Sequence, residues 1–283
     1  MMFIATIVLS IAEWSYALIM SVVQGLTEFI PISSSGQLSI LNMLFDGDPQ
    51  AAVDFYFFLH IPTTIAAVTY FRKDIKGFLV SWLPKNATKM AAQRHTTVYL
   101  VASMLVTVSM ALVFAGMLAG FSSNLLVLGI AFLVTAAMLV SSEYWLQKNK
   151  HTRTMDKLTF WRAAGIGLIQ GFAVIPGISR SGATIAGGLW MGLSRVQATR
   201  YSFLLLIPIV IGGSLRDIAR MMQGSLILPS FWISLVSFII AGVVGYLTIE
   251  WMIKLVSKTS LNWFALYATL LGLVLIVLNF VIS

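Results

Sequence analysis

The chain is a succession of long apolar runs separated by short polar stretches. The runs over residues 98–120, 125–144, 231–249 and 263–282 are each close to the ~20 residues that a helix needs to cross a bilayer. The full pattern predicts six membrane-spanning helices, over residues 52–71, 97–119, 124–146, 200–221, 230–254 and 261–282. Two further segments, 3–45 and 160–192, are apolar but broken by proline, glycine and serine. We therefore expect an all-α integral membrane protein.

The two broken segments contain the same motif. Residues 24–36 read QGLTEFIPISSSG and residues 170–182 read QGFAVIPGISRSG, so both have a Gln-Gly, an Ile-Pro and an Ile-Ser-x-Ser-Gly. A second match at the same offset of 146 residues pairs Phe57, Leu59, Ile61 and Pro62 with Phe203, Leu205, Ile207 and Pro208. Two matches in one register favour an internal duplication over chance.

The duplication predicts a first repeat, 1–146, and a second repeat, 147–283, within one structural domain. Each has one broken segment and three spanning helices, and this odd number inverts the second repeat relative to the first. Each broken segment must then be a re-entrant helical hairpin, which Pro31 and Pro176 favour because proline interrupts the helical hydrogen-bond ladder. Irregular backbone at membrane depth has to be buried in protein or face water, so we expect the two tips to meet.

The distribution of charge fits this topology. Hydrophobic residues make up 59% of the chain and charged residues only 10%, against about 25% charged in soluble domains. The net charge of +8 comes mainly from the predicted loops 72–96, 148–162 and 254–258, a pattern typical of cytoplasmic loops rather than nucleic-acid binding. These loops place both termini outside and can contact anionic lipid headgroups. Arg216 and Arg220 are exceptions, because they fall in a predicted outer turn.

Glu28 and Arg180 are the ionisable residues expected at membrane depth. Such residues are costly in hydrocarbon and mark candidate functional sites. Gln24 lies one helical turn before Glu28, on the same face. The alternative is that Glu28 and Arg180 form a structural ion pair, but the surrounding hydroxyl groups exceed what a salt bridge requires.

The small and hydroxyl residues of the two motifs form a candidate anion site. Arginine binds phosphate oxygens in a fork geometry, glycine lets backbone N–H groups approach, and a helix beginning near Gly182 favours an anion at its N-terminus. The candidate substrate-binding residues are Gln24, Ser33, Ser34, Ser35, Gln37, Gly177, Ser179, Ser181, Gly182 and Thr184. The alternative is helix packing by small residues, which explains Gly187 and Gly188 but not an arginine flanked by two serines.

A carboxylate, a serine and an arginine are sufficient for phosphoryl transfer. The serine attacks, the carboxylate takes its proton, and the arginine stabilises the developing charge. A divalent cation bridging Glu28 and the phosphate would compensate further charge. The chain has no cysteine, which excludes thiolate metal sites. His60, in a predicted spanning helix, is expected to be a packing or cavity residue rather than a catalyst.

These residues resemble the undecaprenyl-diphosphate phosphatase family of the bacitracin-resistance type. The first family signature, Glu/Gln-Gly-x-x-Glu followed by Pro-x-Ser-Ser-x-Gly, matches residues 24–28 and 31–36. The second, Pro-Gly-x-Ser-Arg-Ser-Gly-x-Thr, matches residues 176–184 at every fixed position. Residues 191–195 and 202–205 are also similar, so the resemblance covers nearly the whole chain. It implies inverted repeats with two re-entrant hairpins and six spanning helices in the inner (plasma) membrane.

The resemblance also implies an activity. It implies hydrolysis of undecaprenyl diphosphate to the monophosphate, which recycles the lipid carrier of cell-wall synthesis, at a site that opens to the outer face and depends on Mg²⁺ or Ca²⁺. Glu28 matches a catalytic glutamate and metal ligand, Ser34 the proposed nucleophile, and Arg180 the phosphate-holding arginine. Ser179, Ser181 and Thr184 match the rest of the phosphate loop.

Three positions depart from the family pattern. Gln24 replaces a glutamate, Gln37 replaces a histidine, and Arg200 replaces a glutamate. The expected site is therefore less acidic than in other members, and a mechanism based on histidine at position 37 is excluded.

The sequence is compatible with two functions. One is a membrane phosphatase acting on a polyprenyl diphosphate. The other is a lipid-phosphate transporter or flippase that uses the same anion site without hydrolysis, because inverted repeats with broken helices suit alternating access. Either protein could form a homodimer. Release of phosphate by the purified protein distinguishes the two functions.

Overall fold

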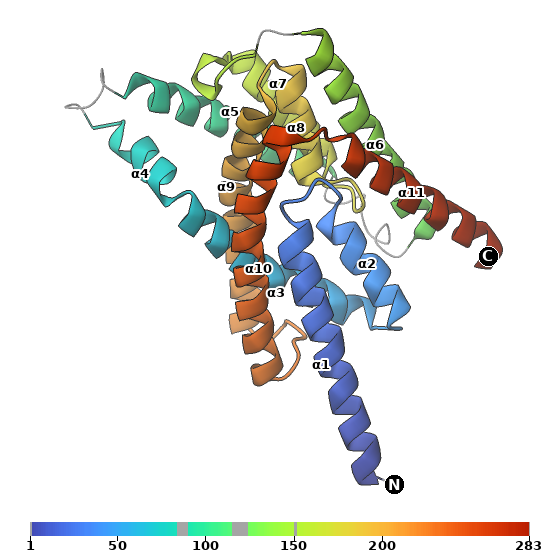
Figure 1. Cartoon of the computed structure of the whole chain (residues 1–283). Helices are drawn as coiled ribbons and strands as arrows, with labels where there is room; N and C mark the ends of the chain where they lie inside the picture. Colours follow the sequence, from blue (N-terminus) through green and yellow to red (C-terminus); the bar gives the residue numbers. More distant parts are fainter. Residues whose placement is uncertain (1, 84–89, 115–123, 150–151, 283) are drawn as a thin grey trace.

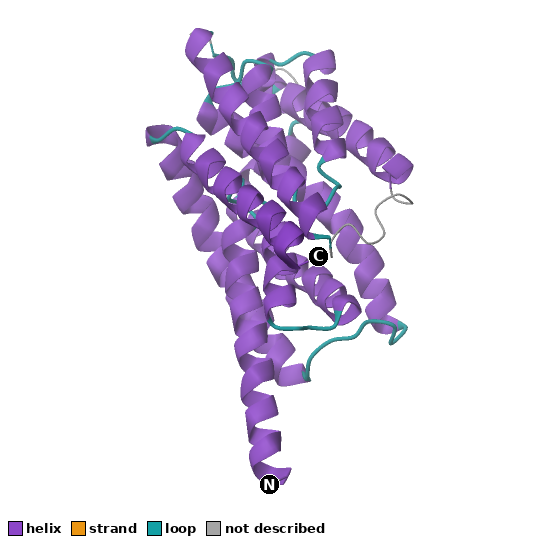
Figure 2. Ribbon diagram, turned by 90° about the vertical axis from the view of Figure 1, so that its right-hand side faces the viewer, coloured by secondary structure: helices purple, strands orange, loops and turns teal. Residues whose placement is uncertain are grey.

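The computed structural model describes residues 2–83, 90–114, 124–149 and 152–282 (Figure 1). Within these residues the regular structure is helical (Figure 2). Their only β-type pairing is a single bridge between Arg153 and Leu193. The all-α class predicted from the apolar pattern is confirmed.

Six helices of the described chain are long and apolar enough to cross a membrane. They are α3 (Pro49–Tyr70), α5 (Ala91–Phe114), α6 (Leu125–Lys148), α9 (Arg195–Met222), α10 (Phe231–Lys258) and α11 (Asn262–Ile282). They correspond one to one with the six predicted spans. Several residues of these predictions lie outside the described residues: 115–119 of the second predicted span, the uncharged stretch 120–123 that follows it, and Lys85, Lys89 and Lys150 of the basic loops.

Each broken segment forms a pair of helices joined by a turn. The first pair is α1 (Met2–Thr27) and α2 (Ser34–Leu44), and the second is α7 (Phe160–Phe172) and α8 (Arg180–Trp190). In Figure 1, α1 runs from the N-terminal end towards the middle of the molecule, and α2 turns back beside it. The first arms differ in length, because α1 has 26 residues and α7 has 13. The re-entrant path of these pairs through a membrane stays a prediction.

The offset found in the sequence recurs in the helix boundaries. α2 begins at Ser34 and α8 at Arg180, both with 11 residues, and α3 and α9 begin at Pro49 and Arg195. α3 and α9 each contain an internal proline, Pro62 and Pro208. The division into two repeats and their inverted orientation stay predictions.

The helices pack as pairs around a buried centre. α10 packs against α1 and α3, α5 packs against α7, and α11 packs against α6. α8 lies between α9, α6 and α7, and nine of its residues are buried. The short helix α4 (Arg72–Val80) between α3 and α5 has no buried residue. The centre of the molecule is therefore built around α8, whose N-terminus carries Arg180.

Four ion pairs join the first 146 residues to the rest of the chain. Within the described structure they are Glu28–Arg180, Asp54–Arg220, Asp74–Arg200 and Glu143–Arg195, and in each the carboxylate comes from the first part and the arginine from the second. Asp54 and Glu143 have side chains that are only 1% exposed. The Asp54 pair explains the presence of Arg220 in a predicted outer turn, because a buried carboxylate compensates its charge.

Candidate active site

The turns that follow α1 and α7 contact each other. The Ser181 hydroxyl donates a hydrogen bond of 3.1 Å to the Ile30 carbonyl oxygen across this contact. A Cβ atom added at Gly36 would lie 3.2 Å from the Cα atom of Gly177, so the two turns leave little room for larger residues there. The two copies of the motif, 146 residues apart in sequence, thus form one site.

Both helices that leave this contact begin with a serine cap. Ser33 accepts a hydrogen bond from the Gly36 N–H (3.3 Å), and Ser179 accepts one from the Gly182 N–H (3.0 Å). The N-termini of α2 and α8 therefore lie at the same site, and the partial positive charge of both favours an anion between them. Ser33 has φ +66°, a left-handed conformation that is uncommon for residues other than glycine.

Glu28 is the centre of the hydrogen-bond network. Its side chain is 2% exposed. Oε2 accepts hydrogen bonds from the Ser34 hydroxyl at 2.6 Å and the Gln24 amide at 3.0 Å, while Oε1 accepts from Arg180 Nη2 at 3.1 Å. In this short hydrogen bond the Ser34 hydroxyl points its proton at the carboxylate, which can accept the proton when the serine oxygen attacks.

Arg180 also contacts a histidine of a third helix. Its Nη2 atom lies 2.8 Å from Nε2 of His60, and this Nε2 lies 3.5 Å from Oε2 of Glu28. His60 comes from α3, which is outside both motifs. The sequence predicted a packing or cavity residue at this position and did not predict its contact with Arg180, although an ionisable side chain inside a spanning helix is itself a signal of function.

Aromatic packing holds the first turn in place. Phe29 follows Glu28 directly, is fully buried and packs edge-to-face against Phe203 of α9, with ring centroids 5.3 Å apart. Phe203 in turn contacts Phe71 at 6.4 Å. Such aromatic pairs contribute about 0.5–1.5 kcal/mol beyond the burial of their area. The carboxylate of Glu28 is thus held next to a rigid apolar cluster.

A small cavity opens at the network. It is lined by Thr27, Glu28, Ser33, Ser34, Ser35, Ile178, Ser179, Arg180 and Ser181. Its volume is about 10 Å³, which is close to the minimum that holds one water molecule. A phosphoryl group is larger than a water molecule. Its entry therefore requires some of the lining side chains to move.

Five of the predicted binding residues do not line this cavity. Gln24 lies behind Glu28, and its Oε1 is buried without a hydrogen-bond partner in the described structure. Gln37 is turned away, because its amide bonds the Ile32 carbonyl and the Tyr267 hydroxyl of α11. Gly177 adopts a positive φ of +92° in the turn before α8. The Gly182 N–H donates to the Ser179 cap of α8, and the Thr184 hydroxyl bonds the Ser202 hydroxyl at 2.5 Å. These residues support the site from behind.

Arg200, the third departure from the family pattern, also lies away from the cavity lining. Its Nη2 atom donates to Asp74 at 2.7 Å, and its guanidinium lies over the Phe71 ring at 5.5 Å. Arg200 therefore joins α9 to α4 and adds no charge to the cavity lining.

The oxygen atoms of the site suit a metal ion that arrives with a phosphate better than a metal ion that the protein holds alone. The described residues contain no cluster of three histidine or carboxylate side chains that could hold a metal ion. The cavity lining offers one carboxylate, Glu28, beside serine and threonine hydroxyls, and the unpartnered amide oxygen of Gln24 lies behind it. Mg²⁺ is commonly bound by one or two carboxylates together with substrate phosphates.

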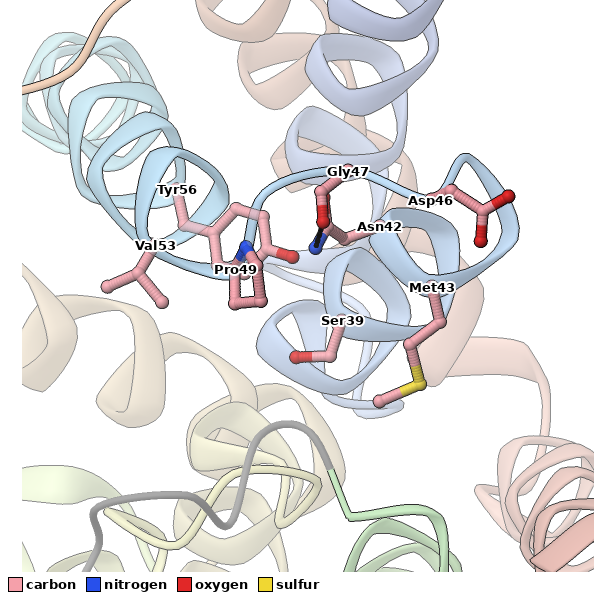
Figure 3. A pocket seen from close by; sticks show the side chains of 8 residues that line it. All are labelled: Ser39, Asn42, Met43, Asp46, Gly47, Pro49, Val53 and Tyr56. Atoms are coloured by element: carbon pink, nitrogen blue, oxygen red, sulfur yellow. Dashed lines mark hydrogen bonds between the residues drawn. The ribbon is translucent and has the colours of Figure 1, made fainter.

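A larger cavity lies at the other end of α2, between α2 and α3 (Figure 3). Its volume is about 380 Å³, and it is lined by Ser39, Asn42, Met43, Asp46, Gly47, Pro49, Val53 and Tyr56. This lining contains one carboxylate and no arginine or lysine, so it does not suit a phosphate. The small cavity at Glu28 is the better candidate for the chemistry despite its size.

The chain is similar to known proteins over most of its length. Residues 17–274 match the model of the family described as bacitracin resistance protein BacA. An undecaprenyl-diphosphatase of Methanosphaera stadtmanae is 37% identical over 281 residues, covering 94% of this chain and 98% of that protein. An undecaprenyl-diphosphatase of Bacteroides thetaiotaomicron is 35% identical, with the same coverage of both chains. Undecaprenyl-diphosphatase 1 of Corynebacterium jeikeium is 37% identical, covering 94% of each chain.

Proposed function

This chain belongs to the BacA family of bacitracin resistance proteins, and from this membership we infer that it is a membrane phosphatase that hydrolyses undecaprenyl diphosphate. The reaction returns the lipid carrier to its monophosphate form. The observation that carries the inference to this site is the convergence of the Ser34 hydroxyl and the Arg180 guanidinium on the buried carboxylate of Glu28.

We propose a two-step phosphoryl transfer at this site. The Ser34 oxygen attacks the terminal phosphorus, and the bond between that phosphorus and the bridging oxygen breaks, so that undecaprenyl phosphate leaves with the electron pair. Glu28 accepts the serine proton, which its 2.6 Å contact with the hydroxyl favours. Water then attacks the phosphoserine, Glu28 returns its proton to the departing serine oxygen, and the two water protons leave with inorganic phosphate.

Arg180 and the two helix N-termini stabilise the charge in both steps. Arg180 presents a planar fork of donors to the phosphoryl oxygens. Ser179 and Ser181 line the same cavity, and the N-terminus of α8 begins beside them. A Mg²⁺ or Ca²⁺ ion bound with the diphosphate would be held by Glu28 and would compensate further negative charge.

The location of the enzyme follows from its helices and substrate. We propose that it lies in the plasma membrane with both termini outside. The exposed Lys73 and Lys76 of α4 would then face the cytoplasm and contact anionic lipid headgroups. The homodimer considered from the sequence stays a prediction.

The decisive experiment is release of phosphate from undecaprenyl diphosphate by the purified protein with Mg²⁺. We expect Arg180→Ala to reduce the rate by about 10³-fold or more and Glu28→Gln by about 10²–10⁴-fold. Ser141→Ala is a matched control, because this exposed hydroxyl bonds only carbonyls of its own helix. Wild-type protein that releases no phosphate but moves lipid phosphate across liposomes would overturn the assignment. Turnover retained by Ser34→Ala would replace serine attack by water attack.

A further inference from the structure

His60 makes contacts at the site that neither motif supplies. Its Nε2 atom lies 2.8 Å from Arg180 Nη2, and its Nδ1 atom lies 2.6 Å from the Tyr56 carbonyl oxygen one turn earlier in α3. The side chain is 12% exposed. The imidazole is thus placed between its own helix and the arginine of α8.

The contact with Tyr56 determines which nitrogen carries the proton. A carbonyl oxygen can only accept a hydrogen bond, so the Nδ1 atom of His60 must be the donor. Nε2 faces Arg180, whose guanidinium can only donate. Both contacts are satisfied by one tautomer of the neutral ring, with the proton on Nδ1 and the lone pair of Nε2 accepting from Arg180.

Glu28 and His60 both contact the same nitrogen of Arg180. Glu28 accepts from Nη2 at 3.1 Å, and His60 contacts the same Nη2. In the described part of the chain, Nε and Nη1 of Arg180 form no hydrogen bond. Two acceptors therefore fix one corner of the guanidinium while its remaining donors stay available for phosphoryl oxygens.

The two acceptors respond differently to a phosphoryl group. Glu28 lines the small cavity that a phosphoryl group would enter, whereas His60 lies on α3, outside the cavity lining. His60 can keep its bond to Nη2 if Glu28 releases Arg180 and keeps its bond to Ser34. The arginine then remains oriented during the step in which the carboxylate changes partners.

We propose that His60 is a positioning residue that holds Arg180 in its phosphate-binding orientation. The proposal rests on the phosphatase function inferred above. His60 acts through the arginine and does not contact the substrate, and it does so from a helix that lies between the two motifs in sequence.

The first test is a double-mutant cycle on phosphate release. We expect His60→Ala to lower kcat by about 10²-fold, the cost of a small misplacement of a catalytic group, with a much smaller change in KM. His60→Gln should recover most of this loss, because its amide oxygen can accept from the guanidinium. In an Arg180→Ala background, His60→Ala should change the rate by no more than about twofold, since the two residues act as one unit.

Thr64→Val is the matched control. Thr64 lies one turn after His60, and its hydroxyl bonds the backbone carbonyl of His60 within the same helix. We expect this variant to retain wild-type kcat. The proposal would be overturned if the double variant lost the product of the two single-variant losses in rate, or if His60→Ala left kcat unchanged. If His60→Ala does not fold, the cycle is run with His60→Gln and His60→Leu.

A second test does not depend on activity. The chain has three histidines, so the ¹⁵N NMR signals of His60 can be assigned by their loss in His60→Gln. We expect the free protein to show a neutral ring protonated at Nδ1, and Arg180→Ala to shift the Nε2 signal. A ring protonated at Nε2 would overturn the positioning role. A wild-type protein that releases no phosphate but shows the expected tautomer would instead overturn the phosphatase function.

Discussion

Ser34 and Arg180 occupy equivalent positions in the two copies of the motif, yet one carries a hydroxyl and the other a guanidinium. Both donate to the same carboxylate, Glu28. The equivalent of Glu28 in the second copy is Val174, which is apolar. The pair of motifs therefore contributes different groups to a single site.

At the residue scale, the sequence predicted the centre of the site but not its surroundings. Glu28 and Arg180 stood out because charges are rare in apolar segments. The contacts of His60 with Arg180 and of Gln37 with Tyr267 were not predicted, because the partner of a polar side chain on a helix depends on which neighbouring helix it faces. No local pattern specifies that Gln37 meets Tyr267, which lies 230 residues later.

The backbone of Ser33 offers a test of strain at the site. Its positive φ costs about 1–2 kcal/mol in a residue with a Cβ atom, while its side chain caps α2. Glycine removes the cost of the positive φ and loses only a few tenths of a kcal/mol of capping energy. Alanine loses about 1 kcal/mol of capping energy and keeps the strain. In detergent, we expect Ser33→Gly to have a higher thermal unfolding midpoint than wild type, and Ser33→Ala to have a lower one. The reverse order for the two variants would show that the conformation is not strained.

Removal of divalent cations tests the ligand set around Glu28. The described residues hold no cluster able to bind a metal ion alone, so a cation should bind mainly with the diphosphate. Treatment with EDTA should abolish phosphate release, and added Mg²⁺ should restore it. The unfolding midpoint of the substrate-free protein should not change. A large fall in the midpoint would instead indicate a metal ion that stabilises the fold.

At the element scale, the apolar pattern predicted all six spanning helices, because helix length and hydropathy are local properties. It also predicted that the broken segments share one plan, and α2 and α8 begin 146 residues apart. It did not predict that α1 would be twice the length of α7. The ion pairs Asp54–Arg220, Asp74–Arg200 and Glu143–Arg195 were also missed, because they join residues more than 50 positions apart.

The pair between Asp54 and Arg220 is the clearest of these links. Asp54 accepts from Arg220 at 3.0 Å and from the Ile227 backbone N–H at 3.0 Å, which ties α3 to the connection between α9 and α10. Removing one member of a buried pair costs about 3–5 kcal/mol. Arg220 is 28% exposed, so we expect about 2 kcal/mol for Asp54→Asn.

This loss should appear as a fall of roughly 4–8 °C in the unfolding midpoint. Glu250→Gln is the matched control, because Glu250 and its partner Lys254 are both exposed. We expect no measurable change for this variant. Equal midpoints for Asp54→Asn and wild type would show that the pair does not stabilise the connection.

At the scale of the whole molecule, the basic loops predict the orientation in the membrane. The chain has no cysteine, so single cysteines can be introduced without background labelling. Ser225 follows α9 and Lys76 lies in α4, and both residues are exposed. We expect Ser225→Cys to react with an impermeant maleimide in intact cells, and Lys76→Cys to react only after permeabilisation. The opposite result would reverse the topology and place the termini inside.

The four ion pairs between the two parts of the chain also bear on how the protein is made. Residues 1–146 carry seven acidic and six basic side chains, and the remaining residues carry three acidic and twelve basic ones. Because synthesis proceeds from the N-terminus, Asp54 and Glu143 enter the bilayer before Arg220 and Arg195 have left the ribosome. Insertion therefore passes through an intermediate in which these carboxylates lack their arginine partners, and a nascent chain arrested at that stage should be a preferred target for membrane proteases.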